Sequence, residues 1–251
     1  MAAIDSVSGT RVERAIAKAA ERSGVDFDYL YKQAHLESGM NPTAQAKTSS
    51  ASGLFQFTKN TWRNTVLQHG AEHGLGWAAN AVASQQDLAA VDALRFEPEA
   101  SAAMAGELAA DNRSALEGAL GREPEPVDLY LAHFLGAAGA TKFLQAYSAD
   151  PSTAAAPLLP QAAASNRAIF YTDNGTPRSV GEIRDLFAAR MGAANAAAAP
   201  TLIPLRTQVS TTQAASSNTD RPMELANFER MPGHLSLAFA QASYAKLSNL
   251  P

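Results

Sequence analysis

The stretch DFDYLYKQAHLES (residues 26–38) has the pattern of an amphipathic helix that carries a carboxyl group near its end. Asp26 can cap the free amides of the first turn. Leu30 and Ala34 follow helical spacing, and Glu37 lies seven residues past Leu30, on nearly the same face. A carboxyl group that faces inward loses hydration, so its pKa rises toward the range that a general acid needs. Glu37 is therefore the candidate acid, although most glutamates at helix ends are structural or solvated.

Two short motifs occur at and after the end of this helix. In ESGMNP (residues 37–42), Gly39 and the following Asn-Pro pair predict the end of the helix. In SSASGLFQF (residues 49–57), Gly53 lets the backbone come close to another group. The same motif places the amide of Gln56 among apolar side chains, which is typical of a cleft for a polar, ring-shaped ligand.

In this order and spacing, the motifs resemble the two leading motifs of the soluble lytic transglycosylases of family 1, whose catalytic domains have a goose-type-lysozyme-like helical fold. The resemblance implies that Glu37 is the single catalytic acid/base and that Gln56 contacts the glycan. We include Phe57 of the same motif among the substrate-binding residues. The family often has a serine between the two motifs, and of the competing residues 47–49 we favour Ser49.

The resemblance continues downstream and covers approximately residues 9–191. LAHFLGAAG (residues 131–139) resembles the family motif Ala-Tyr-Asn-Ala-Gly-x-Gly, with His133 in place of the tyrosine and Phe134 in place of the asparagine. His133 can supply a different polar contact, or it is a hydrogen-bonded histidine of a packed helix. Tyr171 occupies the place of the family's last motif, which carries a tyrosine near the catalytic carboxyl group, but it could equally belong to the core.

The sequence predicts an all-α protein, because no long alternation of period two occurs. We expect a flexible N-terminus over residues 1–9 and a lysozyme-like helical catalytic domain with a substrate cleft over residues 10–191. Helix starts and ends are expected at Thr58, Pro98, Pro126, Ser179, Gly24, Gly70, Gly121 and Gly136.

Residues 192–251 have a different composition, rich in Ala, Ser and Pro, and predict a flexible tail. From residue 193 to residue 219 the only charged residue is Arg206, so this part reads as a linker. Residues 234–250 have a helix-compatible apolar pattern. This segment either folds back on the catalytic domain or docks a partner, such as an envelope or flagellar protein.

The composition excludes several function classes. The net charge of −4 argues against nucleic-acid binding, and no apolar run is long enough to span a membrane. We expect no cofactor and no metal site: the chain has no cysteine, and glycines interrupt the helix that His69 and His73 would need to share. A peptidoglycan substrate implies a periplasmic or cell-wall location, although residues 1–9 show no Sec-type signal peptide and leave the export route open.

The resemblance implies cleavage of the bond between N-acetylmuramic acid and N-acetylglucosamine in peptidoglycan strands, with formation of a 1,6-anhydro product. The sequence offers no acidic residue between residues 38 and 70 that could act as the second carboxylate of a two-carboxylate glycosidase. Two alternatives remain open: a hydrolytic muramidase on the same fold, and a non-enzymatic glycan-binding module.

Overall fold

The computed structural model describes residues 2–47 and 49–197, with side chains for residues 11–47 and 49–192. Over this part of the chain, the protein is all-α, and only isolated β-bridges occur beside the helices. Two elements, η1 and η2, are 3₁₀ helices. In chain order, the elements are α1 (Ala2–Ser23), α2 (Phe27–Ser38), α3 (Lys59–His69), η1 (Gly70–His73), α4 (Gly76–Ser84), α5 (Leu88–Ala93), η2 (Leu94–Phe96), α6 (Pro98–Leu120), α7 (Pro126–Ala149), α8 (Ala155–Leu158), α9 (Pro160–Ser165), α10 (Arg167–Phe170) and α11 (Val180–Ala197).

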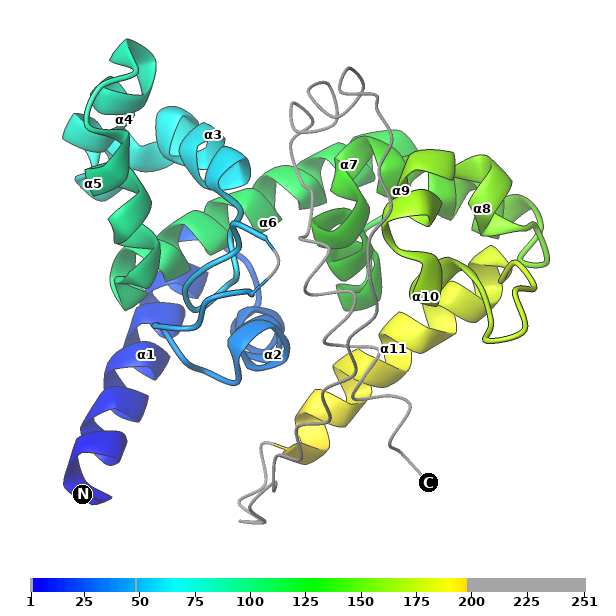
Figure 1. Cartoon of the computed structure of the whole chain (residues 1–251), viewed down its shortest axis with the longest axis horizontal. Helices are drawn as coiled ribbons and strands as arrows, with labels where there is room; N and C mark the ends of the chain where they lie inside the picture. Colours follow the sequence, from blue (N-terminus) through cyan, green and yellow to red (C-terminus); the bar gives the residue numbers. More distant parts are fainter. Residues whose placement is uncertain (1, 48, 198–251) are drawn as a thin grey trace, which may run out of the picture.

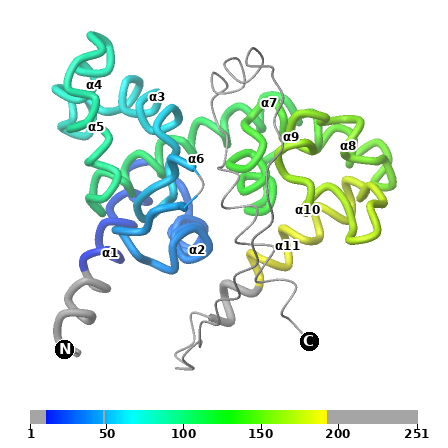
Figure 2. The backbone as a smooth tube through the Cα atoms, in the orientation of Figure 1, coloured from blue at the N-terminus to red at the C-terminus, as the bar shows by residue number. Residues whose placement is uncertain are grey.

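Helix α6 is the centre of the arrangement, with α1 along one side and α7 packed against it further on. Figure 1 shows α3, α4 and α5 gathered at one end and α8, α9 and α10 at the opposite end. The last helix, α11, contacts both α7 and α2. Figure 2 shows it passing below α7 in this view. Helices from the two ends of the described chain therefore meet at α2, which carries Glu37.

The predicted local signals set the ends of most helices. The Asp26 carboxylate accepts a hydrogen bond from the Tyr29 amide at the start of α2, and Gly39 ends this helix in the left-handed conformation. Thr58 caps α3 in the same way as Asp26 caps α2. A capping box forms at the expected helix start at Ser179, because Ser179 and Glu182 each accept a hydrogen bond from the other's backbone amide.

The loop between α2 and α3 is anchored on the backbone of Arg95. A Cβ atom on Gly53 would lie 1.9 Å from the Arg95 carbonyl oxygen, so only glycine fits here. The close approach that the sequence predicts at Gly53 is thus confirmed, and the group that it approaches is the Arg95 backbone. The Arg95 side chain is 4% exposed and donates to the carbonyl oxygens of Ser50 (2.6 Å) and Phe57 (3.1 Å). These contacts fix the second motif against η2.

The core is one continuous cluster of apolar side chains. Trp62 is fully buried and donates its indole N–H to the Val91 carbonyl oxygen at 2.8 Å, which satisfies its only polar atom. In the second half of the chain, Tyr130 meets Phe187 edge to face, with 5.5 Å between ring centroids. Among the described residues, no helix is both long and apolar enough to cross a bilayer.

Several expectations need correction. The first helix, expected from residue 10, begins at Ala2, and α11 continues past Met191 to Ala197, so the first residues assigned to the linker are helical. Helix α4 and the short helices α8, α9 and α10 were not predicted. Helix α7 is interrupted at Gly136, as expected. The linker from residue 198 onward and the segment 234–250 lie outside the described residues.

Candidate active site

Glu37 lies in the last turn of α2, and its side chain is fully buried. Helical spacing puts it on the inward face together with Leu30 and Ala34, which are both 0% exposed. Among the described residues, neither carboxylate oxygen has a hydrogen-bond partner. Gln33, one turn earlier on the same face, also has a buried side-chain oxygen without a partner. A buried carboxyl group with free acceptor atoms is a candidate for acid/base chemistry.

His133 is the nearest ionisable neighbour of Glu37. Its Nε2 atom lies 3.2 Å from the Glu37 Oε1 atom, within ion-pair distance, although the alignment falls short of a hydrogen bond. The imidazole ring stacks on Tyr130, with 6.1 Å between ring centroids and an interplanar angle of 17°. His133 and Tyr130 are three residues apart on α7, so one helical face presents both rings. The structure thus brings together Glu37 and His133, two candidate residues that come from separate sequence motifs.

Arg190 of α11 is a third member of this group, and sequence reasoning missed it. The residue is 7% exposed, and its guanidinium carbon lies 5.2 Å from the centre of the Phe187 ring. Its charge acts on both Glu37 and Tyr130. The signal was present in the sequence, because Arg190 continues the apolar stripe of Val180, Ile183 and Phe187 at helical spacing. A charged residue on a buried stripe is unusual enough to mark a site.

Burial is the dominant influence on Glu37. It raises the pKa of this carboxyl group because the charged form loses hydration, while His133 and the positive charge of Arg190 act in the opposite direction. Burial also raises the pKa of both Tyr29 and Tyr130, and the Glu37 charge adds to this effect. Both tyrosines are thus neutral near pH 7, and the protonated form of Glu37 is favoured, as a general acid requires.

Gln56 holds the loop that follows α2. Its Nε2 atom donates to the carbonyl oxygens of Gly53 (2.9 Å) and Ala44 (3.2 Å). Because carbonyl oxygens can only accept, these contacts assign the nitrogen of the amide to this side and the oxygen to the other. Its backbone has a positive φ of 48°, which costs energy for a residue with a side chain. The contact with the glycan expected of Gln56 stays a prediction, and the atom left for it is Oε1.

Ser49 and the two phenylalanines have structural roles. The Ser49 hydroxyl accepts a hydrogen bond from the Ala51 amide at 3.2 Å, a local turn contact. Phe57 is 3% exposed and meets Trp62 edge to face, while Phe134 is 4% exposed and packs on Phe187. Both rings lie in the core, so they have little surface left for the glycan contacts that we expected.

Tyr171 lies outside the Glu37 group: no described contact connects the two. It follows α10 and forms an isolated bridge with Pro177, while the Arg167 guanidinium lies 4.7 Å from its ring centre. Tyr171 also lines a cavity of about 410 Å³ beside α9. The tyrosines close to the carboxyl group are instead Tyr29 and Tyr130.

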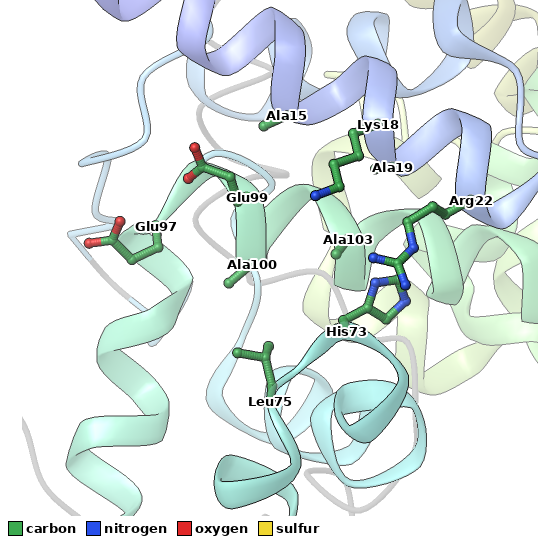
Figure 3. Close-up of a pocket in the computed structure, with 10 residues that line it drawn as sticks. All are labelled: Ala15, Lys18, Ala19, Arg22, His73, Leu75, Glu97, Glu99, Ala100 and Ala103. Atoms are coloured by element: carbon green, nitrogen blue, oxygen red, sulfur yellow. The ribbon is translucent and has the colours of Figure 1, made fainter.

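A separate cavity of about 300 Å³ lies between α1, η1 and the start of α6, and none of its lining residues belongs to the Glu37 group. Figure 3 shows Lys18, Arg22 and His73 toward one side of it and Glu97 and Glu99 toward the other. The charges are largely used within the protein: Arg22 donates to a backbone carbonyl, and both glutamates bind Arg11. This cavity is therefore not a candidate for the acid/base chemistry.

The histidine pair that we considered as metal ligands has a different use. His69 and His73 flank Glu107 of α6: the His73 Nε2 atom lies 2.7 Å from one carboxylate oxygen, and the His69 Nδ1 atom lies 3.7 Å from the other. His69 also contacts Asp111 at 2.8 Å. In the described part of the chain, no group of histidines and carboxylates is arranged to hold a metal ion. The contacts instead connect α3 and η1 to α6.

A comparison with known families finds a similarity in the first part of the chain. Residues 14–112 match the family model of the transglycosylase SLT domain. The matched segment extends from α1 into α6 and includes Glu37 and Gln56, whereas His133 and Arg190 lie beyond it. The resemblance that the two leading motifs indicated is thus confirmed, and it implies an enzyme type that cleaves glycosidic bonds.

Proposed function

Because the chain carries a transglycosylase SLT domain, we propose that it is a peptidoglycan lytic transglycosylase in which Glu37 is the single acid/base. The observation that carries this proposal is the buried Glu37 carboxyl group, whose pKa is raised by burial and which lies within the matched segment. A peptidoglycan substrate implies action in the periplasm or at the cell wall. A partner for the tail beyond the described residues stays a prediction.

The reaction needs two proton transfers, one from Glu37 to the leaving oxygen and one from the substrate back to Glu37. The protonated Glu37 gives its proton to the oxygen between N-acetylmuramic acid and N-acetylglucosamine, and the bond from this oxygen to C1 breaks. The Glu37 carboxylate then takes the proton of the C6 hydroxyl group of the same muramoyl residue, and the C6 oxygen bonds to C1. Glu37 ends protonated, ready for the next cycle, and no water is consumed. The attacking hydroxyl group belongs to the substrate, which lowers the entropic part of the barrier.

The surroundings of Glu37 support this route over a two-carboxylate mechanism. A retaining glycosidase needs a second carboxyl group about 5–5.5 Å from the first. In the described part of the chain, the ionisable groups that shift the pKa of Glu37 are His133 and Arg190, and neither can serve as a carboxylate nucleophile. The nucleophile must then come from the substrate or from water, and the product distinguishes these two sources.

Two residues are proposed to orient the glycan. Gln56 keeps its Oε1 atom available for a substrate hydroxyl or amide, since its Nε2 atom is used within the loop. His133 lies beside Glu37 and is proposed to contact the sugar ring at the scissile bond as well as the carboxyl group. Its position corresponds to the motif tyrosine in the family resemblance, so an imidazole would replace a phenol there.

The test is the rate at which purified peptidoglycan is solubilised by Glu37→Gln. The amide keeps the shape of the side chain but cannot transfer the proton, so the rate should fall by about two to four orders of magnitude. Glu117→Gln is the matched control, since Glu117 is an exposed glutamate of α6 whose change should leave the rate intact. Unchanged turnover by a folded Glu37→Gln enzyme would contradict the proposal.

A further inference from the structure

Arg190 is the most anomalous buried group in the described structure. It is 7% exposed, yet none of its three guanidinium nitrogens has a hydrogen-bond partner among the described residues. A buried guanidinium whose nitrogens have no hydrogen-bond partner carries a desolvation cost that an apolar residue does not carry. Phe187 covers one face of the guanidinium, and this cation–π contact offsets only part of the cost. Packing alone therefore does not account for an arginine at this position.

A continuous series of contacts connects Arg190 to the catalytic group. Its guanidinium lies over Phe187, the Phe187 ring meets Tyr130, and Tyr130 stacks on His133. The imidazole of His133 is 3.2 Å from the Glu37 carboxylate. Helix α11 also contacts α2, the helix that carries Glu37, directly.

We propose that Arg190 is a positioning residue for catalysis: its fixed positive charge stabilises the carboxylate that Glu37 becomes after it protonates the glycan. This inference rests on the proposed acid/base role of Glu37. An arginine stays charged at every pH at which the enzyme works, whereas an imidazole does not. Arg190 would therefore favour the base form of Glu37 in the second step regardless of the protonation state of His133.

The other groups that face Glu37 do not duplicate this charge. Tyr29 comes from α2, and Tyr130 and His133 come from α7; burial raises the pKa of both tyrosines, so they are neutral. Helices α1 and α6 bury no ionisable side chain among the residues described. Within this part of the chain, Arg190 is the one permanently charged group that opposes the effect of burial on the pKa of Glu37.

The test is the pH dependence of turnover on purified, peptide-free glycan strands. The rate falls at high pH when the general acid loses its proton, so the basic limb reports the pKa of Glu37. Arg190→Met removes a positive charge, which raises this pKa. The basic limb should therefore move to higher pH by about one unit, which is the low end of the pKa shifts that a nearby opposite charge causes. The plateau rate should also fall. Arg190→Lys keeps the charge and should leave the limb near that of the wild type.

Arg184→Met is the matched control on the same helix. Arg184 pairs with Glu125 (2.8 Å) and Asp128 (3.2 Å), so its loss should lower stability without moving the basic limb. Should Arg190→Met fail to fold, Arg190→Gln takes its place, since it is polar but uncharged. An unshifted limb in the uncharged variant, or an equal shift in Arg190→Lys and Arg190→Met, would overturn the inference.

A second readout separates this inference from the proposed function. Titration of the Glu37 carboxyl carbon by NMR in the wild type and Arg190→Met reports the same pKa without any turnover. A higher carboxyl pKa in the variant supports the effect of the Arg190 charge on Glu37 by itself. If the wild type then cleaves no glycan, the proposed function fails, and the catalytic role of Arg190 fails with it. Equal pKa values would overturn the inference even if glycan cleavage is established.

Discussion

Gly53→Ala should destabilise the protein more than substitution of a glycine that has a positive φ but open space around it, because two independent costs add. The first is the backbone: φ is 81° at Gly53, and a left-handed conformation costs a residue with a side chain about 1 kcal/mol. The second is contact, since the new Cβ atom would lie 1.9 Å from the Arg95 carbonyl oxygen, and the loop must move away.

That movement weakens the hydrogen bonds that hold the loop. The Gly53 amide donates to Ala44 at 2.8 Å, and Gln56 donates to the Gly53 carbonyl oxygen at 2.9 Å. At about 1 kcal/mol each, their loss brings the total cost to about 3 kcal/mol. With a denaturant slope of about 2–3 kcal/mol per molar urea, the unfolding midpoint should fall by about 1 M.

Gly121→Ala is the control that isolates the contact. Gly121 ends α6 with a φ of 68°, but no other atom lies within 4 Å of the place that a new Cβ would take, so only the backbone cost of about 1 kcal/mol applies. Urea unfolding followed by circular dichroism measures both variants. Equal midpoints for Gly53→Ala and Gly121→Ala would refute the reasoning about the Arg95 contact.

Three further changes test the ion pairs, titration and capping. Arg63→Met leaves the buried Asp92 without its bidentate partner and should cost about 2 kcal/mol in urea unfolding; a loss within error of zero would contradict the pairing. Glu37→Gln should stabilise the protein at pH 7, because the pKa of Glu37 is raised in the folded state and its ionisation therefore costs stability. This cost grows as the pH rises from the ordinary pKa of 4.5 through the folded pKa, so the gain from the substitution should vanish below about pH 4. A gain that persists at this low pH would argue against the titration of Glu37. Ser179→Ala removes the acceptor of the Glu182 amide and should cost about 1 kcal/mol, so an unchanged melting temperature would show that the cap is dispensable.

The long helices and their ends were predictable because their signals are local. Asp26, Thr58 and Ser179 cap as expected, and α6 ends at Gly121, since each signal depends only on a few neighbouring residues. The short helices α8, α9 and α10 were missed for the same reason. Each spans six residues or fewer, which is too short for a helical period to be visible.

The site was predictable in its parts but not as an assembly. Glu37 and His133 were each identified from a motif, yet only the fold shows that they lie 3.2 Å apart. Periodicity also cannot separate a ring in the core from a ring in a cleft, which is why Phe57 and Phe134 entered the list of glycan contacts. Arg190 was missed because the apolar stripe of its helix was interpreted as core alone.

The measurement that tests the central claim most directly is a digest of purified peptidoglycan in water enriched in oxygen-18. If Glu37 directs the attack of the C6 hydroxyl group, the wild type will release 1,6-anhydromuramoyl ends that are lighter by one water, carry no oxygen-18 and resist reduction by borohydride. Glu37→Gln should release almost none of them. Muramoyl ends that carry oxygen-18 and are reduced by borohydride would contradict the account and identify the enzyme as a hydrolase.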